Sequence, residues 1–212
     1  FDKNLLIQNV TFSFMNLKFS LNSFSFLWTI ICFLLFLNAI NMFDGINLQV
    51  GIYSLICITY LYFSSSYFSE LNLLMIISLI IFLILNKRSK SFLGNSGSYF
   101  LGFLISALFI KSYNLESVLF VEEIVLIMII PGIDLIRLFF LRILKKRHPF
   151  SPDRNHIHHY LLQKYNLNTA VLIIVTLVTI PLFLAKITGE YMIFLILQFF
   201  MYFILLRFLK KN

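Results

Sequence analysis

The stretch "TAVLIIVTLVTIPLFLAKITGEYMIFLILQFFMYFILLRF", from Thr169 to Phe208, holds two apolar runs separated by a short polar break. Each run has about the 20 residues that a helix needs to cross the hydrocarbon of a bilayer. An apolar surface of this length suits lipid rather than water as its surroundings. The stretch therefore predicts two membrane-crossing helices, Thr169–Lys186 and Tyr191–Phe208.

Five similar runs precede this pair along the chain. They are Phe24–Ile40, Ile46–Phe63, Leu71–Asn86, Ser98–Ile110 and Val118–Ile143. The sequence is 60% hydrophobic and only 12% charged, with a mean hydropathy of +0.91, so a soluble domain would lack polar residues to cover its surface. We predict an all-α polytopic membrane protein with about seven transmembrane helices, forming a single domain over residues 1–212.

The first 23 residues follow a different pattern. The segments "VTFSF", Val10–Phe14, and "LKFSL", Leu17–Leu21, alternate apolar with polar side chains on either side of Met15 and Asn16. This alternation predicts a short β-hairpin outside the membrane. Because the segment has neither the basic start nor the apolar core of a signal peptide, we expect further helices to precede it in the complete protein.

The basic residues are distributed unevenly between the two sides of the predicted membrane helices. If each run crosses the membrane, 13 of the 17 basic residues fall on one side. They are Lys87, Arg88, Lys90, Arg137, Arg142, Lys145, Lys146, Arg147, Arg154, Lys164, Arg207, Lys210 and Lys211. Because loops rich in lysine and arginine stay in the cytoplasm, we expect the basic side to be cytoplasmic, with an extracytoplasmic hairpin and a cytoplasmic C-terminus.

This asymmetry accounts for most of the net charge of +8, including Lys210 and Lys211. The chain has no soluble module in which basic and aromatic residues alternate, so nucleic-acid binding is not expected. Cys32 and Cys57 lie inside apolar runs, where we interpret them as small buried residues rather than as a disulfide or a metal site.

Three polar segments fall on the predicted cytoplasmic side, and the first is "NAINMFDGIN". In it, Asn38, Asn41 and Asp44 are spaced by three residues, so on a helix they form a slanted polar stripe. Such a stripe is suited to hydrogen-bonding a polar ligand. The alternative is that these residues only finish a helix at the membrane surface, with Gly45 as its C-terminal cap.

The second polar segment is "LGNSGSYFLGF", which leads into an apolar run. Backbone amides at the helix start predicted near Ser98, with Gly94, Ser96 and Gly97 before it, suit a phosphate group. The alternative is a flexible turn, in which Gly97 and Gly102 allow close helix packing. The segment is not a P-loop, because no Gly-Lys-Ser/Thr follows.

The third segment is "PGIDLIRLFFLRILKKRHPFSPDRNHIHHYLL". Asp134 and Arg137 are three residues apart, which favours an ion pair on one helical face, and such a pair is either structural or functional. The residues that follow cluster histidines with basic side chains and predict an anionic ligand. They are His156, His158, His159, Arg154 and Lys164. Their spacing does not favour zinc, and a merely solvated loop is the other alternative.

Taken together, these motifs resemble the polyprenyl-phosphate N-acetylhexosamine-1-phosphate transferases, or glycosyltransferase family 4, which include the phospho-N-acetylmuramoyl-pentapeptide transferases. The segment "SPDRNHIHH" is the most specific match. The resemblance implies an enzyme that moves a sugar 1-phosphate from a UDP-sugar to a polyprenyl phosphate lipid, with UMP released and Mg²⁺ required. In that family, this transfer starts lipid-linked polysaccharide or cell-wall synthesis. The oligomeric state, including a homodimer, stays open.

The resemblance also implies roles for individual residues. Catalytic roles fall on Asp44, His156, His158 and His159, substrate binding on Asn38, Asn41, Gly94, Ser96, Gly97 and Arg154, and magnesium binding on Asp44 and Asn95. The histidines would face the diphosphate or the sugar from a cytoplasmic loop, residues 144–167.

The sequence departs from the family pattern at three places. The adjacent aspartates of an earlier family loop have no counterpart, Asn95 replaces the usual aspartate, and Asn47-Leu48 replaces a second Asp-Gly. A scaffold that has lost catalysis is therefore one alternative. A transporter is the other, with an ion path marked by Asp134, Arg137, Glu122 and Glu123.

Overall fold

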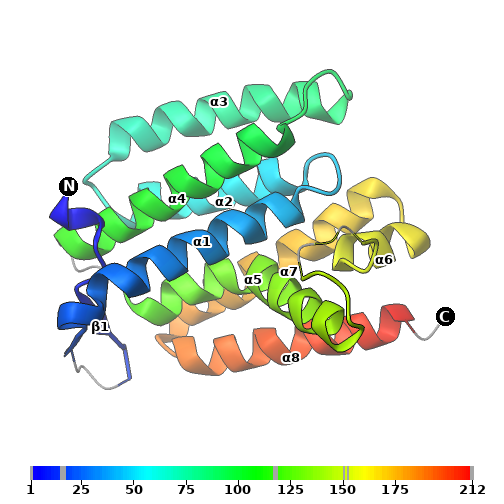
Figure 1. Ribbon diagram of the computed structural model, residues 1–212. Helices are drawn as coiled ribbons and strands as arrows, with labels where there is room; N and C mark the ends of the chain where they lie inside the picture. The colour runs from blue at the N-terminus through cyan, green and yellow to red at the C-terminus, as the bar shows by residue number, and fades with distance from the viewer. Residues whose placement is uncertain (1, 15–17, 117–118, 150, 152, 211–212) are drawn as a thin grey trace.

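All seven apolar runs form helices in the computed structural model, which describes residues 2–14, 18–116, 119–149, 151 and 153–210 (Figure 1). These helices are α1 Ser25–Phe43, α2 Gln49–Ser64, α3 Ser69–Lys87, α4 Gly94–Glu116, α5 Val121–Leu144, α7 Leu167–Thr188 and α8 Tyr191–Lys210. A shorter helix, α6 Ile157–Lys164, lies in the segment between α5 and α7. The predicted all-α membrane fold is confirmed.

Six of the described helices are long and apolar enough to cross a membrane. The exception is α2, which has 16 residues. At about 1.5 Å per residue, this helix is shorter than the roughly 30 Å hydrocarbon layer. Helix α2 nevertheless lies alongside the central part of the neighbouring helices. The chain therefore still alternates between the two ends of the bundle (Figure 1).

The predicted hairpin is confirmed near the N-terminus. Strands β1 Asn9–Thr11 and β2 Lys18–Ser20 pair antiparallel, and the predicted turn at Met15 and Asn16 lies outside the described residues. The 3₁₀ helices η1 Lys3–Leu5 and η2 Asn22–Phe24 flank the hairpin.

The hairpin is attached to the helices by hydrogen bonds. The Thr11 amide donates to the Tyr113 hydroxyl over 2.7 Å, and the Ser13 hydroxyl donates to the Glu122 carboxylate. These bonds satisfy polar groups that would otherwise be buried without partners. They fix the hairpin to α4 and α5.

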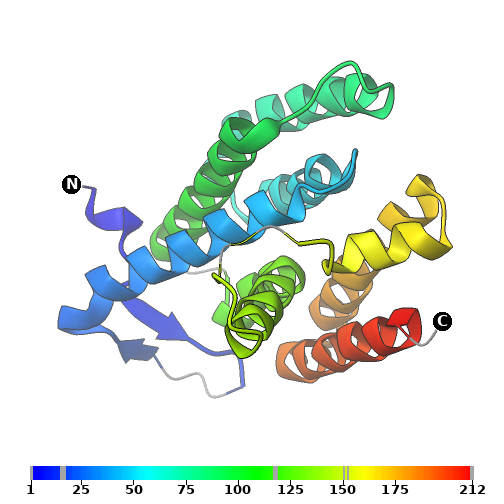
Figure 2. The same ribbon diagram turned by 45° about the vertical axis from the view of Figure 1, so that its right-hand side comes forward.

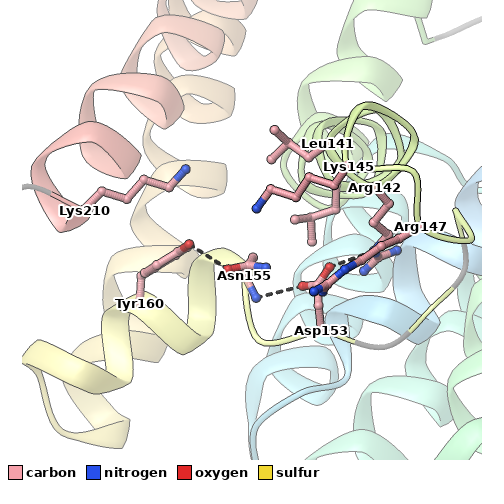
Figure 3. A pocket seen from close by; sticks show the side chains of 9 residues that line it. Leu141, Arg142, Lys145, Arg147, Asp153, Asn155, Tyr160 and Lys210 are labelled. Carbon is pink, nitrogen blue, oxygen red and sulfur yellow. Dashed lines mark hydrogen bonds and ion pairs between the residues drawn. The ribbon is translucent and has the colours of Figure 1, made fainter.

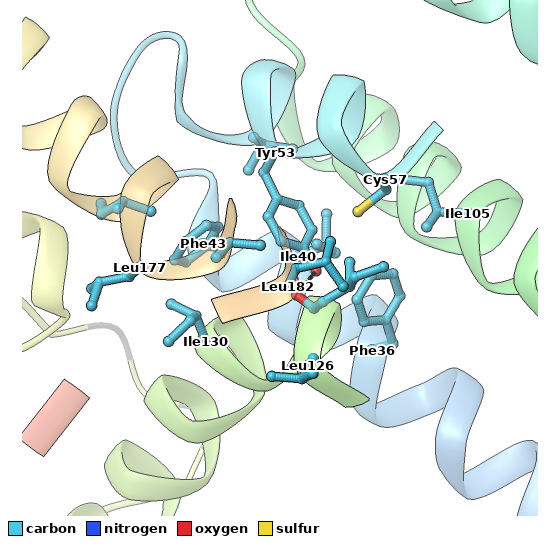
Figure 4. Packing of buried hydrophobic residues seen from close by; sticks show 14 of the residues in the cluster. Phe36, Ile40, Phe43, Tyr53, Cys57, Ile105, Leu126, Ile130, Leu177 and Leu182 are labelled. Carbon is cyan, nitrogen blue, oxygen red and sulfur yellow. Dashed lines mark hydrogen bonds between the residues drawn. The ribbon is translucent and has the colours of Figure 1, made fainter. Parts of the chain in front are cut away.

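The apolar core lies where α1, α2, α4, α5 and α7 meet (Figure 4). It includes Phe36, Ile40, Phe43, Tyr53, Cys57, Ile105, Leu126, Ile130, Leu177 and Leu182. Helix α4 approaches α1 closely at Gly102, where an added Cβ would lie 3.3 Å from the Leu37 Cα. This contact confirms Gly102 as a packing glycine, whereas the atoms nearest to a Cβ on Gly97 would be those of Leu93 in its own segment.

The two ends of the bundle differ in what they carry. The α1–α2 loop, the α3–α4 loop, α6 and the C-terminus lie at one end, which we call the polar end, and the hairpin lies at the other, the hairpin end (Figures 1 and 2). Helix α6 contacts both α7 and α8. The three polar segments of the sequence are therefore at the same end, as predicted.

Candidate active site

The first polar segment ends helix α1 and turns toward α4. Asp44 is the C-cap residue, and its amide bonds to the Ile40 and Asn41 carbonyls. Its carboxylate is half-buried, and burial raises the pKa of Asp44 above the usual range. The side chain of Asn38 donates to the Leu34 carbonyl of its own helix over 2.7 Å. The predicted stripe is thus divided, because Asn38 is turned back along α1.

Asn41 joins the first polar segment to the second. Its side-chain nitrogen lies 2.8 Å from the Ser98 hydroxyl and 3.2 Å from the Asn95 oxygen. Asn95 is exposed at the surface, whereas Ser98 is buried. Two predicted site residues, Asn41 and Asn95, are therefore brought together, and Ser98 adds a contact that the sequence did not reveal.

The second polar segment belongs to the first turn of α4 rather than to a loop before it. The helix begins at Gly94, which has a φ of +59° that favours glycine. The predicted helix start near Ser98 was therefore too late. Gly94 and Ser96 lie in the turn whose amides have no acceptor within the helix, while the Gly97 amide bonds to the Leu93 carbonyl.

The third polar segment reaches the first through His158. A Cβ built on Gly45 would lie only 2.0 Å from Nε2 of His158, so the imidazole fills the space beside this glycine. His158 is 1% exposed, and neither ring nitrogen has a hydrogen-bond partner among the described residues. Residue 45 must therefore be glycine for this histidine to reach the Asp44 turn.

The electrostatic surroundings of His158 keep the ring neutral. Burial, followed by the nearby His159 and His156 rings, lowers the pKa of His158 to about 3. The pKa of His159 is also lowered, by burial and then by His156 and Arg154. His158 therefore offers a neutral imidazole, which can accept or donate one hydrogen bond.

Asp134 contacts His156, the remaining histidine of the cluster. Its Oδ2 lies 2.7 Å from Nδ1 of His156, and its Oδ1 accepts from Arg137 over 2.7 Å, which confirms the predicted ion pair. The Tyr202 hydroxyl also donates to Oδ1, over 2.5 Å. Asp134 is 2% exposed, so this buried carboxylate ties α5, α8 and the start of α6 together.

The three imidazole rings lie against one another. The rings of His156 and His158 are stacked with centroids 5.3 Å apart, and those of His158 and His159 are 4.3 Å apart. Because Asp134 fixes His156, this stacking also fixes the position of His158. Among the residues that the structure describes, no group of three or more His, Cys, Asp or Glu side chains is arranged to hold a metal ion.

The basic residues near the histidines differ in their orientation. Arg154 is exposed, so a ligand at the surface can reach it. Lys164 instead donates to the Phe208 carbonyl over 3.0 Å and lies 4.5 Å from the centre of the Phe208 ring. The prediction that Lys164 shares an anion with the histidines is therefore not supported by its contacts, which place it against α8.

The structure adds residues that the sequence did not single out. Tyr202 lies within an apolar run, where a lone hydroxyl gives little signal, yet it reaches Asp134. Arg142 and Asp153 form a buried ion pair of 2.7 Å across the loop after α5, and this pair had a signal, because opposite charges flank a proline-containing segment. Gln49, 1% exposed at the start of α2, has no side-chain partner among the described residues.

An apolar groove runs along the membrane-spanning part of α5. It has a volume of about 530 Å³ and lies between α1, α4, α5 and the hairpin. Its lining extends from Ile7 and Val10 near the hairpin, past Trp28 and Phe109, to Ile136. Because Ile136 follows Asp134 by two residues, the groove ends close to the level of the Asp134 cluster.

Comparison with known proteins identifies the family of this chain. The family model of glycosyl transferase family 4 matches residues 3–113, just over half of the sequence. The chain belongs to glycosyl transferase family 4. The family indicated by the sequence motifs is thus confirmed, and the matched region includes Asn41, Asp44 and Asn95.

Curated relatives extend the similarity over the histidine segment. An undecaprenyl-phosphate alpha-N-acetylglucosaminyl 1-phosphate transferase of Yersinia pestis is 28% identical over 208 residues, which cover 90% of this chain and 55% of the relative. The protein of the same name in Escherichia coli strain K12 is 25% identical over 226 residues, 93% of this chain and 59% of the relative. A probable undecaprenyl-phosphate N-acetylglucosaminyl 1-phosphate transferase of Bacillus subtilis is 33% identical over 158 residues, 70% of this chain and 44% of the relative.

These alignments also show how much of each relative this chain covers. The chain spans about half the length of the curated relatives it matches. No solved structure matches the chain significantly.

Proposed function

We propose that the complete protein transfers a sugar 1-phosphate from a UDP-N-acetylhexosamine-type donor to a polyprenyl phosphate, and that this chain supplies one part of the active site. The observation that carries this proposal is the meeting of three distant segments at the polar end, because Asn41 contacts Asn95 and His158 contacts Gly45. The names of the relatives support the reaction, since each names an undecaprenyl phosphate and a 1-phosphate transfer.

The reaction needs charge neutralisation and positioning. An oxygen of the polyprenyl phosphate attacks the phosphorus that carries the sugar, and the bond from this phosphorus to the UMP oxygen breaks. The products are a polyprenyl diphosphate sugar and UMP. Because both substrates are polyanions, the protein has to hold their phosphates in line and offset their repulsion.

The residues at the polar end suit these tasks. The backbone amides of Gly94 and Ser96, in the first turn of α4, can donate hydrogen bonds to a phosphate oxygen. The exposed guanidinium of Arg154 can pair with another phosphate oxygen. His158 has two unpartnered nitrogens at the Asp44 turn, so a bound phosphate or sugar hydroxyl would satisfy one of them. His159, half-buried beside it, is the second candidate for contact with the diphosphate or the sugar.

Two side chains at the polar end also carry oxygen atoms that suit magnesium. Asp44 offers a carboxylate, and Asn95 offers an amide oxygen that Asn41 orients by a hydrogen bond. Magnesium prefers oxygen ligands and is usually held by one or two carboxylates together with substrate phosphates. Asp44 and Asn95 would therefore hold the ion, which when bound would offset phosphate charge. Asn95 supplies coordination without charge.

The apolar groove suits the hydrocarbon of the acceptor. Its walls come from membrane-spanning parts of α1, α4 and α5, so a polyprenyl chain could enter it from the bilayer. The phosphate at the end of that chain would then lie near the polar end. In this proposal, a lipid substrate and a soluble nucleotide sugar would meet at one membrane surface.

The polar end would face the cytoplasm of a bacterial plasma membrane. The uneven distribution of the basic residues supports this orientation. Single cysteines at Lys90 and at Tyr67, which are both exposed and lie at opposite ends of α3, separate the two orientations. In intact cells an impermeant thiol reagent should label Tyr67→Cys alone, and labelling of Lys90→Cys alone would reverse the assignment.

The function itself is tested by transfer of labelled sugar phosphate from UDP-N-acetylglucosamine into extractable polyprenyl lipid. Membranes should contain the complete protein that includes this chain, either unchanged or with Asp44→Ala, and Ser78→Ala on the exposed face of α3 serves as the control. We expect transfer with the parent and the control, and its loss with Asp44→Ala. If the folded parent transfers nothing, the scaffold alternative replaces the enzyme.

The transporter alternative is less well supported by the arrangement of charges. Glu122 and Glu123 lie at the hairpin end of α5, and Asp134 and Arg137 lie toward the polar end. The ten residues between Glu123 and Asp134 are all apolar, glycine or proline. Helix α5 therefore provides no intermediate ionisable group for an ion path.

A further inference from the structure

A small basic cavity lies where the ends of α5 and α8 meet α6 (Figure 3). Its volume is about 100 Å³. The basic lining consists of Arg142, Lys145, Arg147 and Lys210, and Figure 3 shows Lys145 and Lys210 pointing into the space between the two helices. None of the residues that line this cavity belongs to the catalytic cluster proposed above.

Arg142 provides a preformed donor in this cavity. Its side chain is 4% exposed, its Nε donates to Asp153 over 2.7 Å and its Nη1 donates to the Pro149 carbonyl over 2.8 Å. Its Nη2 is buried without a partner among the described residues. Because an unsatisfied buried donor is unfavourable, an acceptor bound in the cavity would stabilise this arrangement.

The balance of charge in the cavity favours an anion. The lining has four basic side chains and one acid, Asp153, which is already paired with Arg142. Partial burial opposes ionisation of Asp153, but hydrogen bonds from Arg142 and the Asn155 amide outweigh it, so the pKa of this carboxyl is lowered. The positive charges of Lys145, Arg147 and Lys210 remain to be offset.

The size and position of the cavity point to the phosphate of a lipid. A volume of about 100 Å³ is room for one phosphate group. Lys210, at the end of the membrane-spanning α8, also borders an open depression of about 440 Å³ along Phe203 and Leu206. A phosphate in the cavity could therefore continue into hydrocarbon on the surface of α8.

We propose that this cavity binds the headgroup phosphate of an anionic phospholipid, with an acyl chain in the depression beside Phe203. Basic pockets between membrane helices commonly hold such headgroups. The site would fix the end of α8 against α5 and α6. This proposal does not depend on the transfer reaction, because it concerns binding by residues outside the catalytic cluster.

Thermal unfolding of the purified complete protein that includes this chain, in mild detergent, tests the proposal. Phosphatidylglycerol should raise the melting temperature in a saturable way, because a ligand that binds only the folded state stabilises it. Phosphatidylcholine and inorganic phosphate at the same concentration should not. The double variant Lys145→Gln/Lys210→Gln should bind phosphatidylglycerol roughly 30-fold more weakly, as expected for two lost basic contacts.

The matched control is Lys87→Gln/Lys90→Gln, which changes the net charge equally at the α3–α4 loop of the same end. All four lysines are exposed, so the fold should persist in both variants. An equal loss of binding in the two double variants would overturn the site in favour of general charge attraction. An equal shift with inorganic phosphate would overturn the lipid assignment, and an equal shift with phosphatidylcholine would leave only the apolar depression.

Discussion

Helix α5 carries buried carboxylates toward both of its ends, and their surroundings differ. At the hairpin end, Glu123 accepts from the Tyr60 hydroxyl over 2.8 Å and from Lys186 over 2.9 Å. Toward the polar end, Asp134 accepts from Arg137 and Tyr202 and contacts His156. Both carboxylates are 1–2% exposed, so burial alone does not distinguish them.

The difference lies in what each carboxylate positions. Glu123 bonds the Tyr60 hydroxyl, a lysine that is 46% exposed and the Phe120 amide of its own helix, so it joins α5 to α2 and α7 and its effect is structural. Asp134 fixes His156, whose ring stacks on His158, and His158 has unpartnered nitrogens beside Gly45. A buried charge therefore stabilises the fold at one end and orients a candidate catalytic ring at the other.

The largest expected effect comes from neutralising these two carboxylates separately. Asp134→Asn leaves Arg137, with its side chain 7% exposed, as an uncompensated buried charge, and should lower the free energy of unfolding by about 3–5 kcal/mol. Glu123→Gln leaves Lys186 in contact with solvent and should lower it by only about 1 kcal/mol. Unfolding in mixed micelles measures both, and equal losses would contradict the distinction between the two ends.

The contact between Gly45 and His158 gives the next largest effect. Either Gly45→Ala or His158→Ala should lower transfer roughly 100-fold, as expected when one positioned polar contact to the reacting groups is lost. His148→Ala, an exposed histidine in the same loop, is the control.

A double-mutant cycle sharpens this test. In the His158→Ala background the added methyl of Gly45→Ala no longer meets the imidazole, so the second substitution should have little further effect. Fully additive losses would show that the two residues act independently.

The pH dependence of stability provides a third test. The pKa of His158 is about 3 in the folded chain and 6.5 when unperturbed. Below pH 6.5 the unfolded state therefore binds an additional proton, and stability should fall with decreasing pH by about 1.4 kcal/mol per unit, or about 2 kcal/mol at pH 5. The loss should level off near pH 3.

His158→Gln should remove this part of the pH dependence, and His148→Gln should retain it. Melting temperatures measured between about pH 7.5 and about pH 5 compare directly how steeply the stability of each variant depends on pH. Parallel slopes for the parent and His158→Gln would mean that the ring is already accessible to protons in the folded chain.

The sequence predicted the elements better than it predicted their contacts. Apolar runs and period-two alternation are local signals, so all seven helices and the hairpin lie where expected. The Asp134–Arg137 pair was predictable for the same reason, because both residues share one helical face.

Contacts between helices were harder to predict. The turn of Asn38 toward Leu34, the direction of Lys164 and the burial of His158 depend on how separate helices approach each other. Such approaches are set by packing of side chains far apart in sequence, which no local pattern encodes.

Tyr202 provides a smaller test of the same comparison. Tyr202→Phe removes a hydroxyl that accepts from Arg137 over 2.9 Å and donates to Asp134, so His156 should be held less firmly. We expect about tenfold lower transfer, equivalent to one hydrogen bond of about 1.4 kcal/mol, together with a shifted pH profile. Tyr60→Phe removes the corresponding hydroxyl from Glu123 and should change stability but not the pH profile of transfer. Identical pH profiles for Tyr202→Phe and the parent would limit Tyr202 to a structural role.

Asn95 gives the smallest expected effect and the sharpest test of the polar end. Its side-chain oxygen accepts from Asn41, and it lies inside the first turn of α4, so it is not the cap of that helix. If Asn95 is a magnesium ligand, Asn95→Asp adds a negative charge at an exposed position, which is worth about 1 kcal/mol after screening by water. The magnesium concentration for half-maximal transfer by the complete protein should then fall roughly fivefold. Asp44→Asn should raise that concentration or abolish transfer, because it removes the carboxylate. Coincident magnesium curves for the parent and Asn95→Asp would assign Asn95 only the task of holding Asn41 against α4.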